Sequence, residues 1–105
     1  MNKACLVGRL TSKPELRQTS NGIATTRFTL AVNRKHKNAN GEYEADFISC
    51  VAFGRQGEFA EKYLKQGTKI AITGRIQTGS YTNRDGVKVY TTDVVIEDQE
   101  FADSK

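Results

Sequence analysis

Cationic and aromatic residues alternate with apolar ones along two segments that meet at a predicted turn, residues 83–86. Between residues 69 and 77, three even-numbered positions are isoleucines. The odd-numbered positions of this segment and of its continuation toward the turn include polar, cationic and aromatic residues: Lys69, Thr73, Arg75, Gln77 and Tyr81. Arg84 lies in the turn, and Lys88 and Tyr90 follow it. Because a strand points alternate residues to opposite sides, one side can pack while the other meets a ligand. Cations interleaved with aromatic rings suit a flexible polyanion with flat bases, which describes a single-stranded nucleic acid.

The charge balance points to the same class of ligand. The 105-residue chain has a net charge of +4, but residues 1–96 hold 15 Lys and Arg against 8 Asp and Glu, a net charge of +7. Such an excess predicts an acidic partner, although a basic surface that only keeps the protein in solution is the alternative. The acidic residues of 97–105 lie in a segment without periodicity, which we expect to be a flexible end after a single domain at 1–96.

Catalytic and metal-binding patterns are not found. The single histidine, His36, has no Cys, Asp or Glu at metal-ligand spacing, and no glycine-rich phosphate loop precedes a helix. A nuclease cluster of carboxylates from Glu42, Glu44, Asp46 and Asp93 has nothing in its spacing to favour it. The sequence therefore predicts a protein that is not an enzyme and that holds neither a metal nor a cofactor.

The two cysteines and the apolar runs bear on the compartment. Cys5 and Cys50 both lie in apolar stretches, which predicts buried free thiols in a reducing compartment, with a disulfide as the alternative. The chain reaches a turn by residues 11–14, so we expect no signal peptide, and no apolar run approaches the roughly 20 residues of a membrane span. We expect a cytoplasmic protein with no membrane partner.

Periodicity predicts five strands and one helix. We expect strands at 2–10, 23–34, 42–53 and on both sides of the turn at 83–86, with a second hairpin turn at 38–41. Residues 55–66 predict the helix, with Phe59, Tyr63 and Leu64 on its apolar stripe and Gly67 ending it. Five strands with one short helix between strands 3 and 4 is the layout of an all-β OB-fold, a small Greek-key barrel.

Short motifs along nearly the whole chain resemble the DNA-binding domain of bacterial or phage-borne single-stranded DNA-binding proteins (SSB). The motifs occur in the family's order and spacing: LVGRL at 6–10, PELR at 14–17, NG at 21–22, FTLAV at 28–32, DFI at 46–48, VAFG at 51–54, AEKYLKQG at 60–67, GRIQT at 74–78 and YTTDVV at 90–95. The resemblance implies an OB-fold that coats and protects single-stranded DNA without sequence preference during replication, recombination and repair. It also implies a nucleoid-associated protein.

The resemblance assigns roles to particular residues. It places base-stacking aromatics at Phe47, Phe53 and Tyr81, and it puts His36 where the family has a further aromatic. Packing in the core is the alternative for the two phenylalanines, and cross-strand packing is as good an interpretation as stacking for Tyr43 and Tyr90. We expect the phosphates to be contacted by cations along the path: Arg27, Arg34, Lys35, Lys37, Arg55, Lys62, Lys69, Arg75, Arg84 and Lys88.

The family resemblance also implies an assembly and shows one departure. A homotetramer is expected, in which first strands pair between subunits through Lys3, Ala4, Cys5, Leu6, Val7, Gly8 and Arg9. The family usually continues into a linker and an acidic tip that recruits other proteins, and 97–103 does not match that tip. Recruitment through such a tail is not expected of this sequence. A weakly DNA-binding interaction module and an RNA-binding barrel are the remaining alternatives, and the order of the motifs argues against both.

Overall fold

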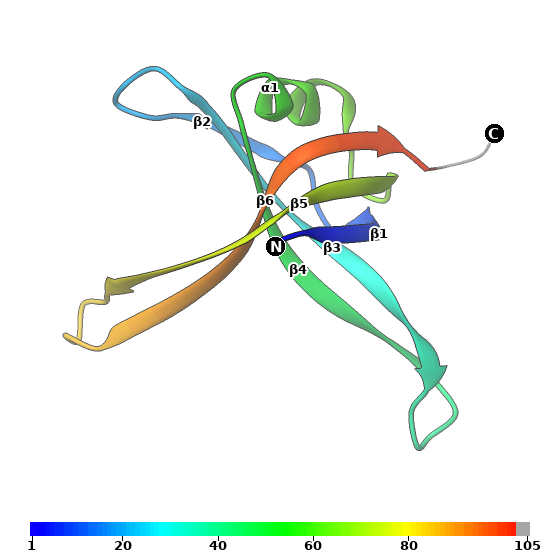
Figure 1. The fold of residues 1–105 in the computed structure, drawn as a ribbon. Coiled ribbons are helices and arrows are strands. Elements are labelled where there is room, and N and C mark those ends of the chain that lie inside the picture. The colour runs from blue at the N-terminus through cyan, green and yellow to red at the C-terminus, as the bar shows by residue number, and fades with distance from the viewer. Residues whose placement is uncertain (103–105) are drawn as a thin grey trace.

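A computed structural model describes residues 1–102. The described part of the chain forms six strands and one helix: β1 (Ala4–Leu10), β2 (Glu15–Gln18), β3 (Ala24–Lys37), β4 (Tyr43–Phe53), α1 (Gly54–Tyr63), β5 (Lys69–Thr82) and β6 (Lys88–Phe101). The strands follow the order β1-β5-β6-β4-β3-β2, and β1 also pairs with β3. Five strands therefore close into a barrel, which confirms the predicted all-β OB-fold (Figure 1).

The helix lies where the sequence predicted it, after the strand at 42–53, but it stands between β4 and β5 because the described residues form one strand more than the five predicted. The difference comes from β2, a four-residue strand that pairs only with β3 at the edge of the sheet. All four residues of β2 are exposed, so this segment lacks the apolar alternation by which the other strands were recognised.

The core follows the predicted alternation. Phe28 and Leu30 of β3 face Cys50 and Ala52 of β4, and together with residues of β1, β5 and β6 they fill the barrel: Leu10, Ile70, Ile72, Val94 and Ile96. Helix α1 covers one end of the barrel with Gly57 and Ala60. A Cβ on Gly57 would lie 2.6 Å from the carbonyl oxygen of Ala52, so only glycine permits this close approach.

The helix is shorter than the sequence predicted. It ends at Tyr63, because Leu64 adopts an extended backbone and inserts its side chain into the core. Tyr63 was expected on the buried stripe, but its side chain is 49% exposed, and Phe59 is only partly buried. The small residues make the closest contact with the barrel, so the aromatic rings lie at the margin of the interface.

Strand β6 continues past the predicted end of the domain. Thr73 pairs with Asp98 whereas Gly74 pairs with Ile96, so Glu97 is an extra residue in a β-bulge. The bulge shifts the alternation by one, which returns Gln99 to the buried side. Residues 97–101, expected to be a flexible end, therefore belong to the sheet, and 103–105 lie outside the described residues. Because the shift breaks the period of two, the sequence pattern seemed to stop at Ile96.

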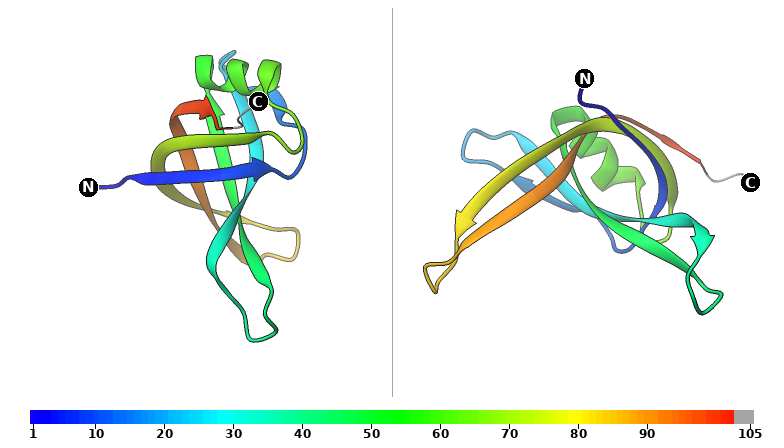
Figure 2. Two further views of the ribbon diagram at one scale, coloured as in Figure 1. Left: turned by 90° about the vertical axis from the view of Figure 1, so that its right-hand side faces the viewer. Right: turned by 60° about the horizontal axis from the view of Figure 1, so that its bottom comes forward.

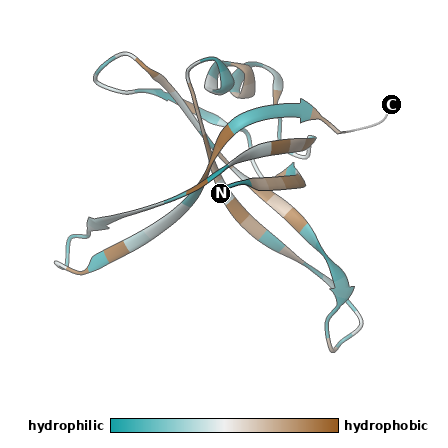
Figure 3. Ribbon diagram, viewed as in Figure 1, coloured by the Kyte–Doolittle hydropathy of each residue, from teal (hydrophilic) through white to brown (hydrophobic). Residues whose placement is uncertain are grey.

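Two hairpin arms extend from the barrel on the side opposite α1 (Figures 1 and 2). The β3–β4 arm turns at Asn38 and the β5–β6 arm at Asn83, and each asparagine accepts two backbone N–H bonds through its side-chain oxygen. The end of the β3–β4 arm is hydrophilic, whereas apolar residues gather where the strands cross (Figure 3). Since the arms leave the core, neither face of their outer parts is buried by it.

The two cysteines differ in environment and both are free thiols. Cys50 lies in the core, as predicted, but Cys5 is exposed, because it lies on the outward side of β1. Burial, with a further contribution from the negative charge of Asp93, raises the pKa of Cys50 to about 12. The thiolate is the nucleophilic form, so Cys50 is unreactive while the protein is folded.

We therefore expect iodoacetamide at pH 8 to leave Cys50 unmodified in the native protein and to alkylate it once denaturant is added. Mass spectrometry of peptides from the two samples measures this directly. Rapid native alkylation of Cys50 would contradict its placement in the core.

Candidate nucleic-acid interface

Three exposed aromatic residues share the outward face of the sheet between the two arms. Phe47 pairs with Ala31 and Phe53 with Thr25 across β3 and β4, whereas Tyr81 pairs with Val89 across β5 and β6. Cross-strand partners point to the same face. Cys50, which lies in the core beside Phe28, is an odd number of positions from Phe47 and from Phe53 along β4. Since successive residues of a strand alternate between faces, Phe47 and Phe53 point away from the core. Phe47 is 68% exposed, Phe53 43% and Tyr81 57%. Burial in the core, the alternative considered for the phenylalanines, is thus excluded.

A contact between the two hairpins joins these aromatics into one surface. The Ser49 hydroxyl of β4 donates a hydrogen bond of 2.7 Å to the Asp93 carboxylate of β6. The guanidinium of Arg27 on β3 lies 3.4 Å from the same carboxylate. Ser49 lies two residues from Phe47 on β4, so the two side chains point to the same face. Asp93 pairs with Gln77, which points to the same face of β5 as Tyr81. The outward faces of the two hairpins are therefore continuous.

An open groove of about 580 Å³ follows this contact, and hydroxyl groups form much of its lining: Arg27, Ser49, Ser80, Tyr81, Thr91, Thr92 and Asp93. At the junction of β4 and β6, Val51 and Val95 are buried although they lie outside the core cluster. The groove thus combines hydroxyl donors, a cation and an exposed ring beside an apolar junction.

The structure divides the predicted phosphate contacts between several locations. Arg27 and Arg75 have the parity of the outward aromatic face, and Arg84 lies at the end of the β5–β6 arm. Lys35, His36 and Lys37 are exposed near the end of the β3–β4 arm. Arg55 and Lys62 lie on α1, and Lys69 starts β5 beside β1. The sequence placed all of these along one path, but the fold separates the last three from the groove.

Lys88 and Tyr90 belong to the other side of the β5–β6 arm. Tyr90 pairs with Ser80 and Lys88 with Thr82, so both point opposite to Tyr81. The Lys88 ammonium lies 5.3 Å from the centre of the Tyr90 ring, a cation–π contact. Lys37 makes a similar contact with Tyr43 at 5.6 Å. Both tyrosines, whose roles the sequence left open, are exposed.

Arg34 is held by two carboxylates. Its Nε and Nη2 donate to Asp46 Oδ1 at 3.1 and 2.8 Å, and its Nη1 donates to Glu44 Oε2 at 3.0 Å. Asp46 and Glu44 alternate with Phe47 and so point to the opposite face. The hydrogen bond from Arg34 lowers the pKa of Asp46 below its ordinary value, and the same bond raises the pKa of Arg34. Three of the five guanidinium N–H groups are thus occupied, and the two carboxylates compete with a phosphate for Arg34.

Sequence reasoning missed Ser49, Asp93 and the hydroxyl residues of the groove. Ser49 has the same parity as Phe47 and Phe53, which is a signal that could have indicated it. Asp93 was considered only as part of a nuclease cluster, but it lies on the opposite side of the sheet from Asp46 and Glu44. The described residues contain no group of three or more His, Cys, Asp or Glu placed to hold a metal ion.

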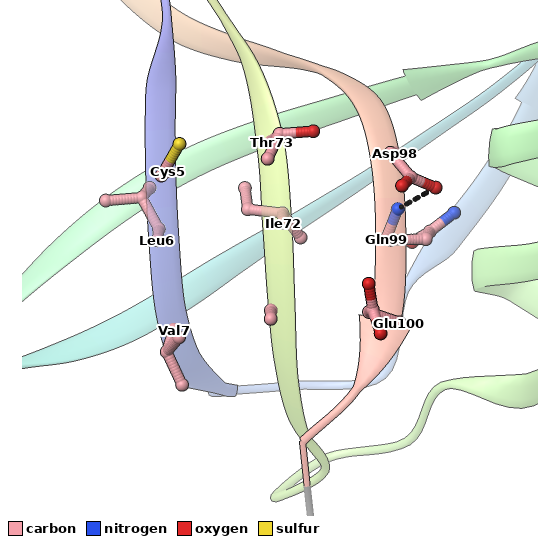
Figure 4. A pocket seen from close by; sticks show the side chains of 9 residues that line it. Cys5, Leu6, Val7, Ile72, Thr73, Asp98, Gln99 and Glu100 are labelled. Carbon is pink, nitrogen blue, oxygen red and sulfur yellow. Dashed lines mark hydrogen bonds between the residues drawn. The ribbon is translucent and has the colours of Figure 1, made fainter.

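The expected assembly strand, β1, has an incompletely paired edge. It pairs with β5 from Ala4 to Arg9, but with β3 only at Arg9 and Leu10. Val7 is exposed, and a hollow of about 200 Å³ lies beside it. Cys5, Thr73 and Asp98 contribute to this hollow from three neighbouring strands, β1, β5 and β6 (Figure 4). These are features of a surface that another chain could cover.

Comparison with known proteins identifies the family of this chain. Residues 1–102 match the model of the single-strand binding protein family. A single-stranded DNA-binding protein from Clostridium perfringens is 53% identical over 105 residues, and this chain spans 67% of its length. Single-stranded DNA-binding protein 3 from Listeria innocua and a relative from Halalkalibacterium halodurans are each 50% identical, and the chain spans 66% and 62% of them. The chain belongs to the single-strand binding protein family.

Family membership confirms the expected class, a binding protein and not an enzyme. Among residues 1–102, the structure contains no helix with the length and apolar character needed to cross a bilayer.

The Arg34–Asp46 pair predicts a pH dependence. Because the folded state favours ionised Asp46, the pair stabilises the protein above the ordinary carboxyl pKa, and this contribution is lost as pH falls through the lowered value. In an NMR titration we expect the Asp46 carboxyl to protonate at a lower pH in the wild type than in Arg34→Gln. Glu44→Gln is the matched control, since Glu44 makes no hydrogen bond to Asp46. An unchanged midpoint in Arg34→Gln would exclude the interaction.

Proposed function

We propose that this chain binds single-stranded DNA without sequence preference. The observation that carries the proposal is the continuous outward face with Phe47, Phe53 and Tyr81 exposed around a groove that contains Arg27. Relatives about 50% identical are named single-stranded DNA-binding proteins, which supports the same ligand here. Large exposed rings in an otherwise well-packed barrel contribute nothing to the core, so a ligand-binding role explains them best.

The mechanism follows from the chemistry of the rings and cations. Every base has a flat face, so a ring on the protein can stack on any unpaired base, whereas duplex DNA covers its base faces within its own stack. For single-strand binding proteins as a class, each stacked base contributes about 1–3 kcal/mol. Arg27 and Arg75 beside the rings, and the cations of the two arm ends, then neutralise the phosphates. No base edge needs to be read, which accounts for the absence of sequence preference.

The predicted cations differ in how directly they can take part. Besides Arg27 and Arg75, we assign Lys35, Lys37 and Arg84 to the path. His36 would stack on a base or contact a phosphate at the end of the β3–β4 arm, and Arg55 on α1 would contact a strand that continues beyond the groove. Arg34 and Lys88 can join only where the strand bends around an arm, because they point to the reverse side. Lys62 and Lys69 lie farther from the groove and would serve a longer strand that wraps the barrel.

We further propose that the protein protects single strands in the cytoplasm, at the nucleoid, during replication, recombination and repair. These roles rest on family membership and on the absence of sequence preference in the proposed mechanism. A protein that binds any unpaired strand suits every process that exposes one.

We also propose a homo-oligomer, most simply a tetramer, in which β1 edges pair between copies through residues 3–9. The incompletely paired edge of β1, exposed Val7 and the adjacent hollow support this assembly. Backbone groups along an open strand edge readily pair with another strand, and burial of Val7 would add apolar contact.

Fluorescence anisotropy with labelled oligo(dT) and with a labelled duplex tests the proposed function. We expect tight binding to oligo(dT), much weaker binding to the duplex, and a slope of log affinity against log salt near −0.7 per phosphate neutralised. Tyr81→Ala should weaken oligo(dT) binding by roughly five- to 150-fold, the range for one stacked base in this class.

Tyr90→Ala is the matched control for this variant. Tyr90 is also an exposed tyrosine of the same arm, but it points to the other face. We expect it to change affinity less than Tyr81→Ala. Equal binding of duplex and oligo(dT), or equal effects of the two tyrosines, would contradict the stacking face.

The assembly is tested by Val7→Asp. A charge at the centre of the proposed interface should reduce the mass measured by light scattering after size-exclusion chromatography, because an aspartate resists burial between subunits. Val87→Asp is the control, since Val87 is also an exposed valine but lies in the turn of the β5–β6 arm. A wild type of monomeric mass, or an unchanged mass in Val7→Asp, would overturn the β1 interface.

A further inference from the structure

We propose that Arg17 and Thr25 form a phosphate-binding subsite on β2 and β3, next to Phe53, over which a single strand leaves the barrel. The inference rests on the proposed function and extends it to residues that neither the family resemblance nor the sequence pattern assigned. Arg17 is a residue of β2, the short strand that the sequence did not predict.

The register places this subsite in line with the stacking face. Arg17 pairs with Thr25 across β2 and β3, and Thr25 pairs with Phe53 across β3 and β4. The three residues therefore form one row on the outward face. Adjacent strands lie about 4.8 Å apart, so the row spans about 10 Å. A nucleotide stacked on Phe53 would place a neighbouring phosphate beside this row.

A small groove of about 170 Å³ marks the position, lined by Glu15, Arg17, Thr25 and Arg27. The Arg17 side chain is 84% exposed, and its 3.7 Å contact with Glu15 is a weak exposed pair that a phosphate can replace. Arg27, on the same groove, also lines the larger groove near Tyr81, so it connects the two. An anion here would meet two guanidinium groups and one carboxylate.

The hydroxyl of Thr25 is the second indication. Its oxygen is buried but makes no hydrogen bond with any residue the structure describes, whereas most buried polar atoms in proteins have a partner. The neighbouring Thr26 hydroxyl, on the inner face, donates to the Gly57 carbonyl at 2.6 Å. Because Thr25 as a whole is only partly buried, rotation about its χ1 angle would turn the hydroxyl into the groove, where a phosphate oxygen held by Arg17 and Arg27 would accept its hydrogen bond. Arginine forms bidentate bonds with phosphate.

The pair Thr25→Val and Thr26→Val separates ligand binding from folding. We expect Thr25→Val to keep the thermal stability of the wild type, because its hydroxyl makes no bond in the free protein, while its affinity for oligo(dT) falls about two- to fivefold. Thr26→Val should lower Tm by about 4–8 °C through the lost internal bond, with the affinity of the folded protein unchanged.

The charge of Arg17 is tested in the same assay. Arg17→Gln should weaken oligo(dT) binding about two- to fivefold and reduce the salt slope by about 0.7, as expected for one lost phosphate contact. Lys65→Gln removes an equal charge just after the end of α1, at an exposed residue that lines neither the groove at Arg17 nor the one at Tyr81, and should keep the wild-type slope.

A double-mutant cycle shows whether the subsite adjoins Phe53. Residues that act on one nucleotide are coupled, so Arg17→Gln and Phe53→Ala should be non-additive, whereas Arg17→Gln and Tyr81→Ala should add. Wild-type binding with unchanged affinity and slope in Arg17→Gln would overturn the subsite and leave the proposed function standing. Failure of the wild type to bind oligo(dT) would overturn the proposed function itself.

Discussion

The fold depends on a short parallel contact between β4 and β6. Cys50 pairs with Val94 and Val51 with Val95, and all four residues are buried. This two-residue ladder joins one hairpin to the other, and β1 closes the barrel from the opposite side by pairing with both β5 and β3. Beyond the ladder the hairpins have no common core to hold them together, so they diverge as two arms. The outward face between them is a consequence of this junction.

The same junction controls the electrostatics of that face. Asp93 lies one residue before Val94, so its carboxylate reaches Ser49 and Arg27 across the gap between the hairpins. A basic surface therefore has a carboxylate at its centre, which orients Arg27 without removing the charge of the cations around it. On the reverse face, Arg34 is bound by Asp46 and Glu44. The acidic residues thus pair with Arg27 and Arg34 and leave the other exposed cations of the arms more available to a polyanion.

The outward aromatics are free to act because the barrel does not need them. Leu30, Leu64 and Ile70 are fully buried and supply the packing that stabilises the fold. Phe47 and Phe53 alternate with residues that contact this core and are thereby fixed in direction by strands rather than by mobile loops. A stacking surface on rigid strands loses less conformational freedom on binding than one built from loops.

The period of two predicts the strands and puts Tyr81 on the side opposite the isoleucines of β5, because it is a local property that assigns residues to faces before any strand pairs. It leaves open whether Phe47 and Phe53 face the core. Their outward direction was expected from the family resemblance, and the closed barrel from the layout of five strands and one helix. Tertiary structure decided the rest. The β-bulge at Glu97 exists only because β6 pairs with β5. The hydrogen bond from Ser49 to Asp93 joins residues 44 positions apart in the sequence. Arg34 and Lys88, which composition alone could not separate from the other cations, point to the reverse side. Periodicity assigns a side chain to a face, but only the register between distant strands decides which faces join and which charges are paired.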